Sequence, residues 1–187
     1  MEEQKLVKTH HGGYRRLKSF QISRVVYDVT VAFCNRYVPR NSRTHDQMVQ
    51  AARSCVQNIA EGSCASGTSS LTELRLTGVA RASLEELRLD FEDFLRQRML
   101  PLWPANHPVL VRFKETRCKS LDEFQAWFHR ESAATLSTSS YQETIQANGI
   151  LSMINLARFL LDRQIESLER SRDAILHGER TRFRRTR

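Results

Sequence analysis

Apolar residues recur at helical spacing through most of the chain. Between Tyr14 and Val38 they form two stripes, and polar residues share the remaining face. The first stripe contains Ile22, Val25, Val26, Val29 and Phe33, and the second contains Phe20, Tyr27, Val31, Cys34 and Val38. Although valine favours strands, this period predicts a helix. Its two stripes indicate burial on two sides, one within its own bundle and one against a neighbouring subunit.

A second helix is predicted over 44–61, with small apolar residues on its inner face. Asn58, Glu61 and Gly62 come together at its end. We interpret Gly62 as a left-handed helix stop. Asn58 and Glu61 are then expected to satisfy polar groups at the turn. A site of catalytic carboxylates is the alternative interpretation of this segment.

A third helix is predicted from a capping box of Ser70 and Glu73 to a break near Met99. Prolines then interrupt the chain between 101 and 108. Beyond them, a short helix follows a second capping box at Ser120 and Glu123, and a last long helix spans about 141–176.

The pattern therefore predicts an all-α protein with up to five helices. We expect an antiparallel four-helix bundle with a C-terminal helical extension, assembled as a homo-oligomer. The expected divisions are a flexible arm over 1–13, bundle helices over 14–98, a helical region over 99–177, and a basic tail over 178–187. The region over 99–177 either completes the bundle or docks on it.

Composition adds a preference for polyanionic partners. The 187 residues carry a formal net charge of +8, which favours nucleic acid, an anionic membrane or an acidic protein. No apolar run approaches the roughly 18 residues of a membrane span, and no signal-peptide core is present at the N-terminus. We therefore expect a reduced cytoplasmic protein that does not bind membranes and whose four cysteines are free thiols.

Catalytic chemistry finds little support in the sequence. The chain lacks the Glu-x-x-His pairs of di-iron bundles, and it lacks nucleophile-elbow, P-loop and dinucleotide-binding motifs. Glu85 and Glu86 are adjacent, so on a helix they point about 100° apart and cannot flank one bond. We expect no catalytic residue, no metal and no cofactor.

Two short sequence motifs carry a family resemblance. Residues 47–62 end in Asn58-Ile59-Ala60-Glu61-Gly62, and residues 80–87 contain Ser83-Leu84-Glu85-Glu86-Leu87. Through these motifs, the segment from Tyr14 to Leu95 resembles bacterial four-helix-bundle proteins encoded by intervening sequences in rRNA genes. That family also includes the accessory variability determinant of diversity-generating retroelements. Residues 90–180 resemble the suffix extension of some members, and the match lies in short segments such as 90–98, 102–103 and 160–164.

The resemblance implies a ring of five subunits without enzymatic activity. It also implies a basic surface for RNA or DNA and, in retroelements, a reverse transcriptase partner. Asn58, Glu61, Gly62, Ser83 and Glu86 then mark the fold and not a catalytic site. Where many members carry basic residues on helix two, this chain has Val49 and Gln50, which leaves Arg53 as the nearest basic residue.

Basic clusters supply the candidate phosphate contacts. They are Arg15, Arg16, Arg24, Arg53 and Arg81 in the bundle, and Arg182, Arg184 and Arg185 in the tail. The leading hypothesis is an oligomeric nucleic-acid-binding scaffold that serves a reverse transcriptase. The alternative is a protein–protein adaptor whose basic faces meet an acidic partner.

Overall fold

The structure is a computed structural model that describes residues 13–134 and 138–185, with side chains described as far as Ala174. In these residues the chain forms one short 3-10 helix and six α-helices, and it forms no strand. The elements are η1 (Gly13–Arg16), α1 (Lys18–Tyr37), α2 (Arg43–Ala65), α3 (Ser70–Gln97), α4 (Pro108–Thr116), α5 (Leu121–Ala133) and α6 (Ser139–Arg185).

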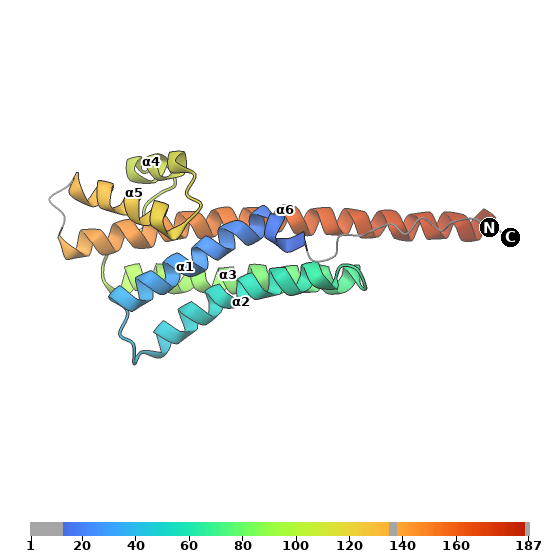
Figure 1. Ribbon diagram of the computed structural model, residues 1–187, viewed down its shortest axis with the longest axis horizontal. Coiled ribbons are helices and arrows are strands. Elements are labelled where there is room, and N and C mark those ends of the chain that lie inside the picture. Colours follow the sequence, from blue (N-terminus) through green and yellow to red (C-terminus); the bar gives the residue numbers. More distant parts are fainter. Residues whose placement is uncertain (1–12, 135–137, 186–187) are drawn as a thin grey trace.

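Four of the helices pack around a common core (Figure 1). α2 contacts α1 and α3, and α6 contacts the same two helices from the opposite side. Successive members of this set run in opposite directions, so α1 and α3 point one way while α2 and α6 point the other. The shorter helices α4 and α5 lie outside the set, against α6, and α5 also contacts α1. The all-α prediction is confirmed.

The core consists of large apolar side chains from all four helices. Among those with almost no exposed surface are Phe33, Met48, Ile59, Leu84, Leu87, Phe91, Ile145, Ile150 and Ile154. The first apolar stripe of α1 lies in this core, apart from half-buried Ile22. Phe20, Tyr27 and Val31 of the second stripe stay half-buried, while the Cys34 sulfur is 3.8 Å from that of Met48 on α2. Part of the second stripe is thus buried within the chain.

The interpretation of Gly62 as a helix stop is wrong. α2 continues through this residue to Ala65, and Gly62 is buried. A Cβ atom there would lie 3.3 Å from the carbonyl oxygen of Glu73 and 3.3 Å from the Cβ of Leu76. Glycine is therefore needed for the close approach of α2 and α3, and its backbone freedom is not what matters.

The ends of α3 also differ from the expectation. Ser69, and not Ser70, caps the helix by accepting a hydrogen bond from the backbone N–H of Thr72. At the other end Met99 adopts a left-handed conformation with φ of 56°, and the Leu100 N–H donates to the Leu95 carbonyl. This is the geometry of a Schellman stop, in which glycine is the usual residue. The Ser120 cap of α5 is confirmed, since its side chain accepts from the Glu123 N–H.

The prolines mark a change of direction and not the edge of the core. α6 begins beyond them, yet it supplies Ile145, Ile150, Ile154 and Leu161 to the same core as α1 and α3. Between the prolines and α6 the chain forms two helices, α4 and α5, where the sequence predicted one. Arg117 separates them, because it ends α4 in a left-handed conformation with φ of 47°. The core therefore draws on residues from both sides of the prolines.

A glycine on α6 controls how α5 packs. Trp127 is 1% exposed and its ring contacts Phe113 and Phe124. A Cβ at Gly149 would lie 2.7 Å from this indole, which is closer than packed side chains allow. Because Gly149 has no side chain, the indole of Trp127 packs directly against α6.

Replacing Gly149 with alanine tests this contact. We expect Gly149→Ala to lower the free energy of unfolding by about 1–3 kcal/mol, because the indole must move within a packed core. Gly78→Ala is the matched control, since nothing lies within 4 Å of the Cβ it would add. That variant should gain about 0.5–1 kcal/mol from helix propensity. Urea unfolding measures both values, and equal stabilisation by the two alanines would contradict the packing argument.

Candidate nucleic-acid interface

Four of the predicted arginines lie along η1, α1 and α2. Arg15 and Arg16 end η1, which packs against α2 and the start of α1. The Cys55 thiol of α2 donates a hydrogen bond to the Ser23 hydroxyl of α1. Arg24 follows Ser23 in the chain, and Arg53 lies two residues before Cys55. All four side chains are exposed. We call Arg15, Arg16, Arg24 and Arg53 the α1–α2 arginines.

The α1–α2 arginines lack the carboxylate partners that seven other described arginines have. Within the described residues no carboxylate forms an ion pair with any of them, and Arg15 instead lies over the Tyr14 ring at 5.7 Å. By contrast, arginines on α3, α4 and α6, together with Arg98 at the end of α3, form ion pairs with acidic residues; these are Arg81, Arg88, Arg96, Arg98, Arg112, Arg158 and Arg163. The α1–α2 arginines are therefore available to an external anion.

Arg81 is separated from this group. It lies on α3, where its guanidinium is 3.1 Å from the carboxylate of Asp162 on α6. About half of the side chain is exposed, so the pair stabilises the fold only slightly. The side chains of Arg182, Arg184 and Arg185, the predicted tail contacts, lie outside the described residues.

The polar residues near the end of α2 form a hydrogen-bonded link to α3. The Asn58 amide donates to the Ser54 carbonyl at 2.8 Å and to the Ser54 hydroxyl at 3.1 Å. Ser83 of α3 donates to the same hydroxyl at 3.0 Å. Asn58 thus bonds within its own helix, one turn back, and Ser54 carries the contact between helices. Glu61 and Glu86 are exposed, and Glu61 does not lie at a turn.

Three titratable groups on α1, α2 and α3 have pKa values that are shifted away from neutrality. The hydrogen bond from Arg88, with a contribution from Arg158, lowers the pKa of Glu85. Burial raises the pKa values of the Cys34 and Cys55 thiols to about 12. Near pH 7 the carboxylate therefore stays charged and the two thiols stay neutral. The described residues hold no cluster of three metal-binding side chains.

An acidic cluster occupies the later part of α3. Burial raises the pKa of Asp90, and the charges of Asp93 and Glu86 raise it further. No ion pair engages Asp90 in the described part of the chain. Its charge is therefore an unfavourable contribution to the folded state at neutral pH.

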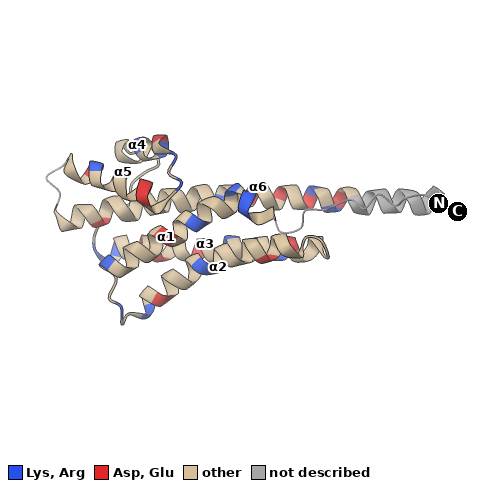
Figure 2. Cartoon of the chain, in the orientation of Figure 1, with Lys and Arg blue, Asp and Glu red and all other residues tan. Residues whose placement is uncertain are grey.

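Basic and acidic residues are interspersed along the helices. Figure 2 shows Lys and Arg on every helix, with Asp and Glu among them on most, and no continuous basic face in this orientation. The net positive charge is distributed over the surface, and a local site depends on which cations lack partners. Among the described helices, none combines the length and the apolar character that crossing a membrane requires.

Comparison with known proteins adds no identity: no family model, no curated protein and no solved structure matches the chain. The interface is therefore defined by its own geometry. Sequence patterns single out the α1–α2 arginines by clustering and resemblance, but they group Arg81 with them. The partner of Arg81 is 81 residues away in the chain, and no local pattern indicates it.

Asp90 gives a prediction with a defined pH dependence. A carboxyl whose pKa is raised in the folded state costs stability as pH rises from its unfolded pKa through its folded pKa. We therefore expect Asp90→Asn to stabilise the protein at pH 7, and this gain should vanish well below the ordinary aspartate pKa of about 3.9. Chemical denaturation across pH measures it. Asp122→Asn at the start of α5 is the control, which should show no gain. A gain that persists at low pH would exclude the charge as the cause.

Proposed function

We propose that the protein is a non-enzymatic, oligomeric scaffold that binds nucleic acid through the α1–α2 arginines. The observation that carries the proposal is that these four exposed arginines cluster on η1, α1 and α2 and lack ion-pair partners among the described residues, whereas seven arginines elsewhere are paired with carboxylates. A guanidinium presents donors in a planar fork that matches the oxygens of a phosphate. Exposed and unpaired, these groups can bind a phosphate backbone without first breaking an internal ion pair.

The electrostatics of the whole chain act in the same direction. A net charge of +8 draws a polyanion toward the surface over a distance of about a Debye length, near 8–10 Å. Binding of this kind releases counterions, depends strongly on salt, and reads little sequence. The four arginines lie on rigid helical elements, so they are suited to fixing the path of a strand.

Oligomerisation supports such weak contacts by repeating them. Leu71 and Leu89 of α3 are 40% and 50% exposed, and they face the same side because about five helical turns separate them. Half-buried Phe20 and Tyr27 on α1 add apolar surface near the α1–α2 arginines. The family resemblance suggests a pentamer and a reverse transcriptase partner. In a ring, each arginine acts several times, so avidity replaces single-site affinity.

A gel-shift experiment with two matched variants tests the interface. The first replaces Arg15, Arg16, Arg24 and Arg53 with glutamine. The second replaces four exposed arginines on other helices, Arg81, Arg96, Arg130 and Arg163, and so removes the same charge. At about 0.15 M salt we expect the first variant to bind RNA or DNA at least about tenfold more weakly than the parent. The second should be affected much less, because its members belong to α3, α5 and α6 and three of them already pair with carboxylates.

Salt dependence and assembly make the result interpretable. For the first variant, the slope of log affinity against log salt should be shallower by about 3, because each phosphate that an arginine no longer neutralises removes nearly one unit of slope. Light scattering should show the same oligomer for both variants and the parent. Equal weakening in both variants would contradict a localised interface. If the parent protein binds neither RNA nor DNA, single- or double-stranded, the proposal fails and an adaptor for an acidic protein takes its place.

A further inference from the structure

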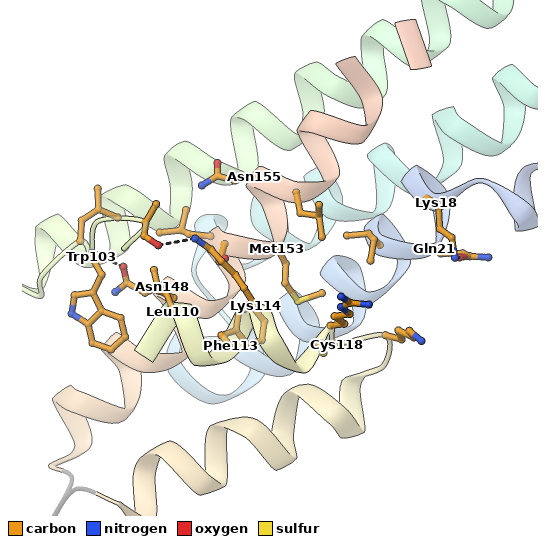
Figure 3. A pocket seen from close by; sticks show the side chains of 18 of the residues that line it. Lys18, Gln21, Trp103, Leu110, Phe113, Lys114, Cys118, Asn148, Met153 and Asn155 are labelled. Atoms are coloured by element: carbon orange, nitrogen blue, oxygen red, sulfur yellow. Dashed lines mark hydrogen bonds between the residues drawn. The ribbon is translucent and has the colours of Figure 1, made fainter. Parts of the chain in front are cut away.

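A large cavity lies beside α6 (Figure 3). Its volume is about 830 Å³, and it opens between α6, α4, the segment that leads into α4, and the first turns of α1. Most of its lining is apolar, including Leu102, Leu110, Leu151, Met153 and Leu156. Pockets that bind small organic ligands have this size and this apolar character.

One end of the cavity is apolar and aromatic. Trp103 lies there, and its ring stacks on His107 with a centroid distance of 4.1 Å. Asn148 is the polar side chain beside it, and its amide is fully engaged. Its oxygen accepts from the backbone N–H of Trp103, and its nitrogen donates to the backbone carbonyls of Pro101 and Thr144. The ammonium of Lys114 also reaches this end, where the carbonyl of Ala105, two residues from Trp103, accepts its hydrogen bond. This end is therefore mainly apolar, with one cation held by the backbone.

The opposite end is cationic. Figure 3 places Lys18 and Gln21 there, with Cys118 nearby, and the neighbours of Cys118 in the chain are Arg117 and Lys119. All three cations are exposed and line the cavity, and no ion pair engages them among the described residues. Lys18 donates only to the neutral Gln21 amide at 3.1 Å.

Two other charged groups line the cavity, and each has an internal partner. The ammonium of Lys114 donates to the Ala105 carbonyl at 2.7 Å. The carboxylate of Glu92 is bound by Arg88 on its own helix. The cavity therefore has a mainly apolar end, where a backbone carbonyl holds Lys114, and an end where three cations lack carboxylate partners among the described residues.

We propose that this cavity binds a long-chain fatty acid, with the hydrocarbon tail toward Trp103 and the carboxylate among Lys18, Arg117 and Lys119. The end-to-end polarity of the cavity matches that of the molecule. An amphipathic peptide helix carries its charges along one side and not at one end, so it matches this arrangement less well. Nucleic acid would leave the apolar walls unused. A volume of about 830 Å³ accommodates a single molecule of this kind.

The two tryptophans allow a direct test. Trp103 lines the cavity, whereas Trp127 is buried between α5 and its neighbours. Bromine quenches indole fluorescence at short range, so titration with dibromostearate should quench the protein saturably. Trp103→Phe should reduce this quenching and leave a remainder from Trp127, which packs on the lining residue Phe113, and unbrominated stearate should reverse it. Non-saturable quenching, or quenching that survives Trp103→Phe unchanged, would overturn the proposal.

Charge variants test the position of the carboxylate. Replacing Lys18, Arg117 and Lys119 with glutamine should weaken stearate binding at least tenfold. The matched control replaces Arg40, Arg43 and Arg96, which do not line the cavity, and should leave binding unchanged. Methyl stearate has the same tail without the charge, and it should compete poorly with stearate in the parent protein. Equal competition by the ester would contradict the cationic end as the anchor.

Vesicles distinguish a free fatty acid from a membrane surface. Sedimentation with phosphatidylglycerol vesicles should give the same result for the cavity-charge variant and its matched control, because the net charge of +8 attracts anionic vesicles wherever the cations lie and the proposed ligand is a single molecule in the cavity. If the cavity-charge variant alone loses vesicle binding and monomeric stearate gives no saturable quenching, the cationic end serves a lipid surface and the fatty-acid proposal is wrong. Circular dichroism on every variant verifies that the fold is retained.

Discussion

The packing of α6 between α1 and α3 is the interaction on which the rest of the structure depends. α2 already joins α1 and α3 on one side, and α6 closes the core on the other. Its inner face contributes Ile145, Ile150, Ile154 and Leu161, all with no exposed surface. Side chains of this size each contribute about 1.5–3 kcal/mol on burial. Without them, the apolar faces of α1 and α3 would be exposed to water.

The same helix organises the parts outside the core. Gly149 leaves space for the Trp127 indole, which holds α5 against α6. Asn148, the residue before it, binds the backbone at Pro101 and Trp103 and so fixes the segment that leads into α4. The cavity beside α6 is therefore a consequence of where this helix places its neighbours. The α1–α2 arginines belong to other helices, and their exposure does not depend on these contacts.

Helical periodicity predicts most of the fold. Most of the first stripe of α1 and the α3 residues Leu84, Leu87 and Phe91 are buried as their spacing indicates, because a 3.6-residue period requires one face to be covered. Leu71 and Val79 of α3 are exceptions, since both are exposed. Gly62 is an exception, because glycine serves both helix ends and close helix contacts, and local sequence does not separate these uses. Two non-glycine residues, Met99 and Arg117, adopt left-handed conformations that no residue preference indicates.

The candidate functional surfaces are predicted unevenly for a related reason. Exposed arginines near one another in sequence, such as Arg15 and Arg16, are identified from clustering alone. The pairing of Arg81 with Asp162 and the cavity between α1, α4 and α6 depend on contacts between distant segments. Such contacts follow from packing, which a pattern within one helix does not contain. For the same reason, the sequence leaves open whether the residues beyond the prolines complete the core or dock on it.

Thermal unfolding of the chain cut after Arg98 tests most directly whether α6 is needed to close the core. The fragment 13–98 retains α1, α2 and α3 but lacks the helix that covers their remaining apolar face. Followed by circular dichroism beside the full chain, it should show low helicity, no cooperative transition and a tendency to aggregate, because three helices leave the core open to water. A soluble fragment that melts cooperatively with nearly the helicity expected for its residues would contradict the account.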